Sequence, residues 1–353
     1  MAVRIMIMAG GTGGHVFPAL AVAQWLIDAG HNVSWLGTRK GLESRVVPAA
    51  NISIDWLSVA GVRGKGVLSI LFAPFMLLVA CWQAMRIISA RNPDVILGLG
   101  GFASGPGGLM AWVLRKPLVI HEQNRVPGTT NKLLKKLSTR VLEAFPKSFS
   151  ADSDAICTGN PIRKNLMVRN KKGPSDGLKL LVIGGSLGAS ILNQVVPYAL
   201  KNIQNELAID VVHQSGKTTL EAAKSNYKQA AIKAKICEFI EDMSAVYSWA
   251  DLVICRAGAM TISEVAIMGL PTIIVPLPSA IDDHQTKNAQ YLSDAGAAVL
   301  IPQSEFSVER LEREIKGIAE DANKRTKMGN KAFELAKPGA TERVANICLE
   351  VAL

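Results

Sequence analysis

Two glycine-rich turns in this sequence contain the residue types that bind phosphate groups. Residues 10–15 read GGTGGH and residues 184–189 read GGSLGA, and each segment follows a short apolar run. Glycine lets the backbone approach a phosphate closely, and a helix N-terminus behind the turn supplies N–H donors and partial positive charge. Each turn therefore predicts a buried strand that passes into a helix at a phosphate site. A third segment of this kind, residues 98–108, reads GLGGFASGPGG.

Two residues close to these turns could accept a proton. His15 ends the first turn, and an imidazole can take up a proton near neutral pH, so His15 is a candidate general base. Glu122 is the rival candidate, because a carboxylate shielded from water has a raised pKa. A structural role for His15, hydrogen-bonded to its own turn or to a phosphate, fits the residues equally well.

The elements that position these turns follow from an internal repeat. Residues 3–11 and 178–185 are both apolar runs that end in a glycine pair, and the chain of 353 residues exceeds what one hydrophobic core usually holds. The predicted fold class is α/β, with two Rossmann-like domains facing a deep cleft. The predicted domains are residues 1–160 and 161–336, with a C-terminal helix over residues 337–353 that returns to the first domain.

Hydrophobic periodicity assigns the elements around the turns. Buried strands are predicted over residues 3–9, 94–97, 178–183, 209–213, 236–239, 252–255 and 272–275. Helices are predicted over residues 18–26, 109–114 and 191–200. Residues 158–177 are predicted to be the linker, because Gly, Pro and Lys interrupt regular structure there.

The positive charge of the chain is concentrated in its first half. Residues 1–175 carry 21 Lys and Arg against 8 Asp and Glu, a surplus of 13 positive charges, whereas the remainder has a surplus of 3 negative charges. Such a basic half indicates a polyanionic partner: nucleic acid, an anionic bilayer or a phosphorylated substrate. Nucleic acid is disfavoured, because no stretch interleaves aromatic residues with basic ones.

Residues 67–85 contain no charged side chain, and an uncharged run of this length suggests a membrane span. A single crossing would separate the predicted strands 3–9 and 94–97, which belong to one sheet, so the segment is predicted to lie on the membrane surface instead. Basic residues on both sides suit such a helix. A core-facing helix with a solvated flank is the alternative. The predicted membrane patch consists of Phe72, Phe75, Met76, Val79, Trp82 and Trp112.

The sequence predicts neither a bound metal nor a cofactor. No two of the five cysteines lie within four residues of each other, so no zinc-type spacing exists, and buried reduced thiols are expected. An Asp-x-Asp pair is also missing, although a divalent ion in solution stays compatible with the sequence. No signal-peptide cleavage site follows the N-terminal apolar run, and a cytoplasmic chain is expected.

Nine segments together resemble one enzyme family along essentially the whole chain. They are GGTGGH at 10–15, GGFASGP at 100–106, HEQN at 121–124, GNPIR at 159–163, GGSLGA at 184–189, HQSGK at 213–217, FIEDM at 239–243, CRAGAMTISE at 255–264 and ATERVAN at 340–346. The family is the bacterial UDP-N-acetylglucosamine–N-acetylmuramyl-(pentapeptide) pyrophosphoryl-undecaprenol N-acetylglucosamine transferases, two-domain enzymes of the GT-B type. The resemblance implies inverting transfer of N-acetylglucosamine from its UDP donor to the C4 hydroxyl of an undecaprenyl-linked muramyl-pentapeptide, in peptidoglycan synthesis.

The resemblance also implies how the site residues divide between the substrates. The residues implied in donor binding are Thr12, Gly13, Gly14, Asn124, Arg163, Ser186, Ile240, Ala259, Met260, Thr261, Ile262, Ser263, Glu264 and Gln285. Those implied in binding the acceptor pyrophosphate are Gly11, Gly101, Ser104, Gly105 and Asn131. The implied location is peripheral, on the cytoplasmic face of the bacterial inner membrane, with the anionic membrane surface and other cell-wall synthesis and division proteins as partners.

Three other functions compete with this interpretation. A UDP-N-acetylglucosamine epimerase of the same fold would need no acceptor and no membrane patch. A dehydrogenase that uses NAD is disfavoured, because GGTGGH lacks the Gly-x-Gly-x-x-Gly spacing. A non-catalytic membrane-binding module would have no use for two glycine-turn domains. Fold alone cannot choose among them, so the site must decide.

Overall fold

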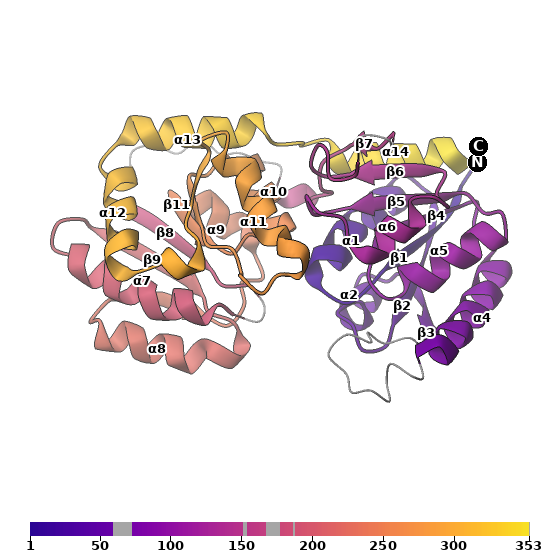
Figure 1. The fold of residues 1–353 in the computed structure, drawn as a ribbon, viewed down its shortest axis with the longest axis horizontal. Coiled ribbons are helices and arrows are strands. Elements are labelled where there is room, and N and C mark those ends of the chain that lie inside the picture. Colours follow the sequence, from indigo (N-terminus) through magenta and orange to yellow (C-terminus); the bar gives the residue numbers. More distant parts are fainter. Residues whose placement is uncertain (59–72, 151–153, 167–176, 186–187, 353) are drawn as a thin grey trace. The chain divides into compact units, whose positions relative to one another are not determined.

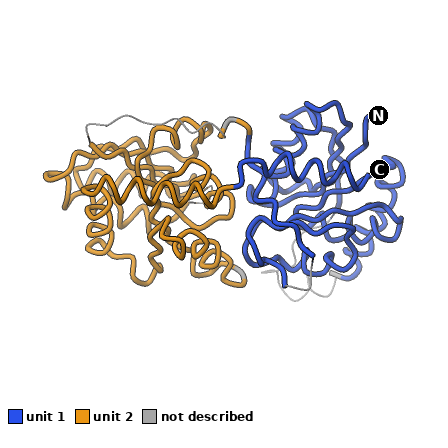
Figure 2. The backbone as a smooth tube through the Cα atoms, turned by 90° about the horizontal axis from the view of Figure 1, so that it is seen from above, with its two compact units in different colours: residues 1–163, 337–353 blue, residues 164–336 orange. Residues whose placement is uncertain are grey.

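The structure, a computed structural model, divides the chain into two compact units. The described residues are 1–58, 73–150, 154–166, 177–185 and 188–352. Unit 1 contains residues 1–163 together with 337–353, and unit 2 contains residues 164–336. Figure 2 colours the two units separately. The first crossing of the chain between them falls after Arg163, so this residue lies in unit 1 rather than in the second domain.

Unit 1 is built on a seven-stranded parallel sheet with the order β3-β2-β1-β4-β5-β6-β7. The strands are β1 (Arg4–Ala9), β2 (Asn32–Thr38), β3 (Ser53–Leu57), β4 (Val95–Gly100), β5 (Leu118–Glu122), β6 (Arg140–Glu143) and β7 (Ile156–Cys157). The helices are α1 (Gly13–Asp28), α2 (Glu43–Ala49), α4 (Ala73–Arg91), α5 (Ser104–Val113), α6 (Thr129–Leu134) and α14 (Ala340–Ala352). The strand order reverses direction between β1 and β4, which is the topological switch point of this sheet.

Side-chain alternation along β1 explains why both faces of this sheet are covered. Ile5 and Ile7 point to the face packed by α1, α2 and α14, whereas Met6 and Met8 point to the face packed by α4, α5 and α6. All four side chains are buried. Strands that are buried on both faces read as continuous apolar runs, as this one does.

The C-terminal helix α14 completes the core of unit 1. It packs on α1, and its buried side chains join the cluster of Ile5 and Ile7. The Thr341 hydroxyl accepts from the Ile162 N–H (3.0 Å) and donates to the Ile162 carbonyl (2.9 Å). The last residues of the chain therefore belong to the same core as the first ones.

Unit 2 repeats the architecture with a six-stranded parallel sheet in the order β10-β9-β8-β11-β12-β13. Its strands are β8 (Leu178–Ile183), β9 (Ile209–Gln214), β10 (Lys235–Cys237), β11 (Leu252–Cys255), β12 (Thr272–Ile274) and β13 (Ala298–Leu300). Its α-helices are α7 (Ser190–Ile203), α8 (Leu220–Gln229), α9 (Met243–Trp249), α10 (Ala259–Met268), α11 (His284–Ser293), α12 (Val308–Ala319) and α13 (Ala322–Glu334), and its 3-10 turns are η1 (Lys164–Leu166), η2 (Lys217–Thr219), η3 (Ile281–Asp283) and η4 (Gln303–Glu305).

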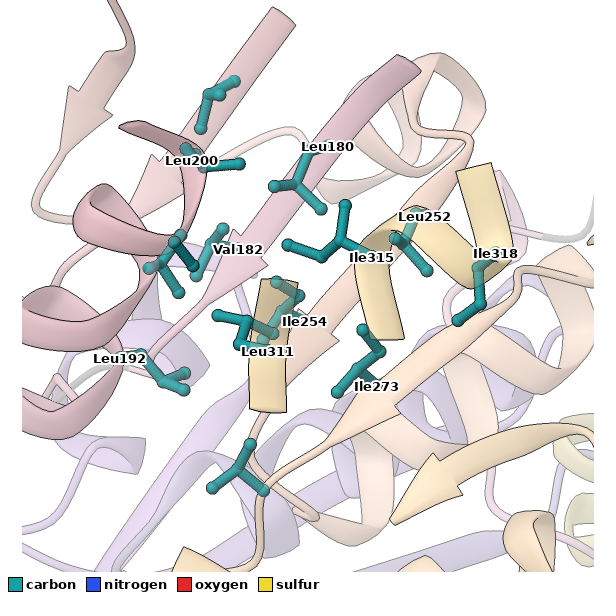
Figure 3. Packing of buried hydrophobic residues seen from close by; sticks show 14 of the residues in the cluster. Leu180, Val182, Leu192, Leu200, Leu252, Ile254, Ile273, Leu311, Ile315 and Ile318 are labelled. Atoms are coloured by element: carbon teal, nitrogen blue, oxygen red, sulfur yellow. The ribbon is translucent and has the colours of Figure 1, made fainter. Parts of the chain in front are cut away.

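One core of unit 2 lies between its sheet and the helices α7 and α12. Figure 3 shows this core, whose labelled members are Leu180, Val182, Leu192, Leu200, Leu252, Ile254, Ile273, Leu311, Ile315 and Ile318. All ten side chains are at most 1% exposed. The switch point of this sheet lies between β8 and β11.

Several element boundaries differ from the sequence predictions, among them those of α1, α5 and β10. Helix α1 begins at Gly13 and not at Pro18, because Thr12 takes the extended N-cap conformation and the glycine turn itself leads into the helix. Helix α5 likewise begins at Ser104, five residues before the predicted start at residue 109. The predicted strand over residues 236–239 is β10, which starts at Lys235 and ends at Cys237.

Candidate functional site

The two glycine turns of unit 1 lie side by side because β1 and β4 are neighbours at the switch point. Gly100 and Gly101 have φ values of +97° and +84°, in the region that favours glycine. A Cβ atom at Gly101 would lie 2.3 Å from the carbonyl oxygen of Gly10, so only glycine allows the turns to touch. The predicted turns around residues 10–15 and 98–106 therefore form one surface at the carboxyl edge of the sheet.

Ser104 fastens this pair of turns from inside. Its side chain is fully buried, and its hydroxyl lies 2.9 Å from the Met8 carbonyl, 2.8 Å from the Gly100 carbonyl and 3.2 Å from the Gly100 N–H. The sequence predicted a direct contact of Ser104 with the acceptor pyrophosphate. Because this hydroxyl is buried and bound to backbone, it fits a role in holding the turn better than a direct phosphate contact. Gly105, the next predicted contact, lies in the first turn of α5.

His15 stands in the first turn of α1, and its ring packs on the second glycine turn. Its Nδ1 atom lies 2.8 Å from Oε1 of Gln123. A Cβ atom at Gly100 would lie 3.2 Å from the imidazole, so the ring rests directly on this glycine. The side chain is half-buried, and Nε2 has no hydrogen-bond partner among the residues that the structure describes. His15 can therefore present Nε2 to a bound hydroxyl group.

Glu122, the rival base, is tied into its own loop. Its Oε1 atom accepts from the backbone N–H of Asn124 (2.9 Å) and from its side-chain amide (3.2 Å). Its Oε2 atom accepts from the Gly128 N–H (3.0 Å) and from Nδ2 of Asn131 (2.9 Å). The carboxyl group is 1% exposed. Four N–H donors occupy both carboxylate oxygens and leave little room for a substrate, so this geometry favours His15 over Glu122 as a base.

Asn131 belongs to the same scaffold. It lies on α6, is 2% exposed, and its Nδ2 atom also donates to the carbonyl of His121 (3.1 Å). Asn131 was predicted to contact the acceptor pyrophosphate, but its side chain is buried and hydrogen-bonded to β5. Its Oδ1 atom has no hydrogen-bond partner among the described residues.

A buried carboxylate that the sequence analysis missed supports the first glycine turn. Glu43, fully buried at the start of α2, accepts from the Gly11 N–H (2.9 Å), from the Thr38 N–H (3.0 Å) and from the Thr38 hydroxyl (2.7 Å). Gly10, Gly11 and the strand end of β2 are thereby joined through one side chain. The only hint of this role in the sequence is a glutamate shortly after a glycine, and it does not reveal that Gly11, 32 residues away, is the partner.

The other unit 1 residues implied in donor binding surround the start of α1. Thr12 is its exposed N-cap, and Gly13 and Gly14 are the first residues of the helix, where N–H groups have no partner within the helix. The Arg163 guanidinium stacks on the ring of Phe17, 4.9 Å from its centroid. The structure thus brings Arg163 close to the first turns of α1, although 148 residues of sequence separate it from His15.

In unit 2, Gln214 joins two of the predicted donor-binding segments. Its backbone carbonyl accepts from the Gly184 N–H (2.9 Å), and its side-chain Oε1 atom accepts from the Ile240 N–H (3.0 Å). Ile240 is 8% exposed. Ser186, the predicted phosphate contact between these segments, lies outside the described residues. The sequence analysis quoted Gln214 within a motif but gave it no role.

Six further donor-binding candidates form the first turns of α10, directly after β11 at the switch point. They are Ala259, Met260, Thr261, Ile262, Ser263 and Glu264. The Ile262 N–H already donates to the Gly258 carbonyl (2.9 Å) and its side chain is fully buried, so Ile262 itself is part of the scaffold. The preceding N–H groups of Met260 and Thr261 are the ones suited to an anion at the helix N-terminus.

Glu264 and Gln285 are both held in place by neighbours. The Tyr247 hydroxyl donates to Oε2 of Glu264 (3.0 Å) in a buried contact. Oε1 of Gln285, on α11, accepts from the N–H groups of Ala257 (3.2 Å) and Leu277 (3.0 Å). This double contact orients the amide, so that its Nε2 atom is the group able to donate to a ligand.

The helices of unit 1 expose a group of large apolar side chains. On α4, Ala80, Cys81, Ala84 and Ile88 form the buried stripe. The exposed side chains on α4, α5 and α6, which we call the apolar patch, are Phe75, Leu77, Leu78, Trp82, Trp112, Val113 and Leu133. Helix α5 packs against both α4 and α6.

The predicted membrane residues follow this pattern only in part. Phe75, Trp82 and Trp112 are 53–67% exposed, whereas Met76 and Val79 are half-buried and Phe72 lies outside the described residues. The Arg86 guanidinium lies over the Trp82 ring at 5.0 Å, and Arg91 forms an ion pair with Asp55 at 2.8 Å. Among the described helices, none combines the length and the apolarity needed to cross a bilayer.

The described residues contain no group of three or more His, Cys, Asp or Glu side chains arranged to hold a metal ion. All five cysteines are free thiols, and burial raises the pKa of Cys255 and Cys348 to about 12. A separate hollow of about 400 Å³ in unit 2 is lined by residues such as Pro276, Asp283 and Gln303. None of the predicted site residues lines it, and it lies beside β12 and β13 rather than at the switch point.

Comparison with known proteins places both halves of the chain in one family of sequences. The glycosyltransferase family 28 N-terminal domain matches residues 5–143, and the C-terminal domain of the same family matches residues 179–344. A protein of Methylococcus capsulatus is 55% identical over 353 residues, which cover 100% of this chain and 99% of the relative. It is named UDP-N-acetylglucosamine–N-acetylmuramyl-(pentapeptide) pyrophosphoryl-undecaprenol N-acetylglucosamine transferase. A protein of Ectopseudomonas mendocina with the same name is 49% identical over 350 residues, 99% of this chain and 98% of the relative.

Solved structures give the same result for the fold. The crystal structure of MurG from Acinetobacter baumannii superposes with a TM-score of 0.83 at 41% identity, over 99% of each chain. A putative UDP-N-acetylglucosamine 2-epimerase from Listeria monocytogenes has a TM-score of 0.68 at 15% identity, over 98% of this chain and 95% of the other. At that identity the epimerase shares the fold alone.

Proposed function

Since this chain belongs to glycosyltransferase family 28, and within it to the UDP-N-acetylglucosamine–N-acetylmuramyl-(pentapeptide) pyrophosphoryl-undecaprenol N-acetylglucosamine transferases, we propose that it transfers N-acetylglucosamine to lipid-linked muramyl-pentapeptide. The donor is UDP-N-acetylglucosamine, and the product is the disaccharide-pentapeptide lipid of peptidoglycan synthesis. The observation that carries the proposal is the full-length relationship at 55% identity, in which both glycine-turn units are present.

Unit 2 binds the donor in this proposal. Its support is that three segments follow strands at the same edge of the sheet. The turn at Gly184 and the N-terminus of α10 flank the switch point, and Gln214 joins the loop at Ile240 to that turn. A nucleotide diphosphate fits this place, because ligands of open parallel sheets bind where the strand order reverses and helix N-termini attract phosphate. Glu264, fixed by Tyr247, accepts hydrogen bonds from the ribose hydroxyls, and Nε2 of Gln285 donates to the sugar.

Unit 1 binds the acceptor and supplies the base. The paired turns at Gly11 and Gly101 hold the acceptor pyrophosphate with their backbone N–H groups. Nε2 of His15 removes the proton from the C4 hydroxyl of the acceptor as its oxygen attacks C1 of the donor sugar. The bond between C1 and the UDP oxygen breaks, UDP leaves with the bonding electrons, and the imidazolium then releases its proton to water.

An epimerase is the second candidate that the sequence left open. Its support is a shared fold alone, as with the Listeria monocytogenes protein at 15% identity. An epimerase would act on the nucleotide-sugar alone, so the two functions are separated by the need for an acceptor.

The decisive experiment offers the purified chain labelled UDP-N-acetylglucosamine with and without a short-chain analogue of the lipid acceptor. Label should move to the acceptor, and none should be released or epimerised when the acceptor is left out. Conversion of the donor in the absence of acceptor, with no labelled lipid in its presence, would replace the transferase by the epimerase.

We also propose that the apolar patch holds the chain peripherally at the cytoplasmic face of the bacterial inner membrane. Phe75 and Trp82 would enter the headgroup layer, and Arg86 beside Trp82 would face anionic lipid. Contacts with other cell-wall synthesis and division proteins stay a prediction from the family resemblance.

Sedimentation with anionic vesicles tests this membrane contact. The double variant Phe75→Glu with Trp82→Glu should stay in the supernatant while the wild-type chain sediments. Phe333→Glu, at an exposed phenylalanine of unit 2, is the matched control and should sediment like the wild type. Equal sedimentation of the double variant and the wild type would refute the patch.

A further inference from the structure

A chain of three side chains runs from the inside of unit 1 to the first glycine turn. Nε2 of His121 lies 3.0 Å from the Gly159 carbonyl, and Nδ1 of His121 lies 3.0 Å from Nε2 of Gln123. Oε1 of Gln123 lies 2.8 Å from Nδ1 of His15. His121 and Gln123 are at most 1% exposed, so no water competes for these contacts.

Backbone carbonyls fix the direction of every hydrogen bond in this chain. Nε2 of Gln123 also lies 3.0 Å from the carbonyl oxygen of His121, which can only accept, so the amide nitrogen of Gln123 must face His121. The amide oxygen consequently faces His15. At the other end, the Gly159 carbonyl also only accepts, and Nε2 of His121 must carry the proton.

His121 stays neutral, which completes the sequence of donors and acceptors. Its complete burial lowers its pKa to about 4, against weaker opposite effects of the Gly159 hydrogen bond and the Glu122 charge. A neutral ring with a proton on Nε2 has a lone pair on Nδ1, and Gln123 donates to it. Every polar atom between Gly159 and His15 is then paired without conflict.

We propose that Gln123 is a positioning residue that holds His15 in the tautomer with the proton on Nδ1 and the lone pair on Nε2. Because Oε1 of Gln123 can only accept, Nδ1 of neutral His15 must donate to it. Nε2 then has no proton, and this is the state that a general base needs. Gly100, against which the ring packs, fixes the plane of the same imidazole. The catalytic consequence depends on the function proposed above, whereas the tautomer does not.

The tautomer can be read directly from the resting protein. The chain has only five histidines, so selective 15N labelling and two-bond proton–nitrogen spectra can assign each ring, with His15→Ala identifying the signals of His15. Near pH 8, wild-type His15 should show a protonated Nδ1 and an unprotonated Nε2. His121 should show the opposite pattern. A proton on Nε2 of wild-type His15 would overturn the proposal without any variant.

Two substitutions of Gln123 separate its acceptor from its bulk. Gln123→Leu keeps the size but removes the acceptor, so His15 should lose its single tautomer, and kcat should fall by about 10- to 100-fold with little change in KM. Gln123→Glu keeps an oxygen that accepts from His15, and in its protonated form the substituted carboxyl group also keeps a donor to His121. It should keep the tautomer and lose less than about tenfold in kcat.

Gln24→Leu is the matched control, because Gln24 lies exposed on the same helix as His15 and contacts Asp28. It should leave both the tautomer and kcat unchanged. An unchanged His15 tautomer in Gln123→Leu, or a lost tautomer with full kcat, would overturn the positioning role. Absence of transfer activity in the wild-type chain would instead refute the proposed function, and the tautomer measurement would still decide the contact between Gln123 and His15.

Discussion

The first glycine turns of units 1 and 2 have similar sequences but are held by different means. In unit 1, the Gly11 N–H donates to the buried carboxylate of Glu43, and Gly101 packs directly on the carbonyl of Gly10. In unit 2, the Gly184 N–H donates to a backbone carbonyl; a Cβ atom at Gly185, like one at its counterpart Gly11, would meet nothing within 4 Å among the residues that the structure describes. Both turns press on a neighbouring turn, because a Cβ atom at Gly188 would lie 2.4 Å from the Ser215 carbonyl oxygen. The difference is that a buried carboxylate accepts from the turn of unit 1, whereas a backbone carbonyl at the end of β9 accepts from the turn of unit 2.

This difference fits a division between chemistry and binding. A base must be held close to its productive geometry, and His15 is contacted by Gln123 and Gly100. The nucleotide site proposed for unit 2 can rely on backbone N–H groups and on the N-terminus of α10. The comparison predicts that the site residues of the two units will respond differently to substitution.

The largest effect is expected from His15, the proposed base. His15→Ala should lower kcat about a thousandfold with little change in KM for the donor, since it removes proton transfer but no donor contact. Glu264→Ala should instead weaken UDP binding by about 10- to 30-fold, the loss of one charge-assisted hydrogen bond. Steady-state kinetics and calorimetry with UDP measure the two. A similar kcat in wild type and His15→Ala would remove His15 from catalysis.

A methyl group should disturb the fold more at Gly101 of unit 1 than at Gly185 of unit 2. Gly101→Ala places Cβ against backbone at a positive φ and should reduce the free energy of unfolding by about 3 kcal/mol. Gly185→Ala has a similar φ of +82° but open space, so backbone strain alone should cost about 1 kcal/mol. Urea unfolding of both variants gives the comparison. Equal losses would mean that the turns of unit 1 do not constrain each other.

The carboxylate of Glu43 should contribute by its acceptors and not by its shape. Glu43→Gln turns one acceptor into a donor facing Gly11 or Thr38, and we expect a loss of about 2 kcal/mol in the stability of unit 1. Amide hydrogen exchange, read separately for the two units, should detect faster opening in unit 1 only. Glu221→Gln, at an exposed pair with Lys224, is the control. Unchanged exchange around Gly11 would remove Glu43 from this role.

The smallest effect is a loss of stability in acid, which each unit should show through one buried histidine. Burial lowers the pKa of His121 to about 4 and that of His213 to about 3. The unfolded chain therefore binds more protons below its ordinary histidine pKa of about 6.5, and the stability present at pH 7 is lost as the pH falls toward the folded values. Between pH 7 and pH 5 the expected loss is about 1–2 kcal/mol per histidine.

A substitution separates the two histidines. His213→Gln should flatten the pH dependence of unit 2 and leave that of unit 1 intact, as measured by hydrogen exchange at pH 7 and pH 5. An unaltered pH dependence of unit 2 in this variant would contradict the assignment.

Much of the architecture was predictable from local pattern. The apolar runs that end in glycine pairs predicted β1 and β8, and the structure confirms both strands and the parallel sheets around them. The predicted helix starts at residues 18 and 109 were wrong, because the glycine turns lead directly into α1 at Gly13 and α5 at Ser104. Proline and side-chain periodicity mark the later turns of a helix, while its first turn depends on backbone conformation.

The sequence by itself determined which residues could do chemistry: two phosphate-type turns, a histidine at the end of one of them, and a family signature along the whole chain. The tertiary structure decided what each polar group contacts. The sheets bring the ends of separate strands to one edge, and only this placement creates the contacts of Gln123, Glu43 and Gln214. Ser104 and Asn131 were found inside the scaffold for the same reason. Residue type indicates which chemistry a side chain can do, and residue spacing indicates the period of a helix or strand. A hydrogen bond between residues 15 and 123, however, exists only once the parallel strands have been placed in order.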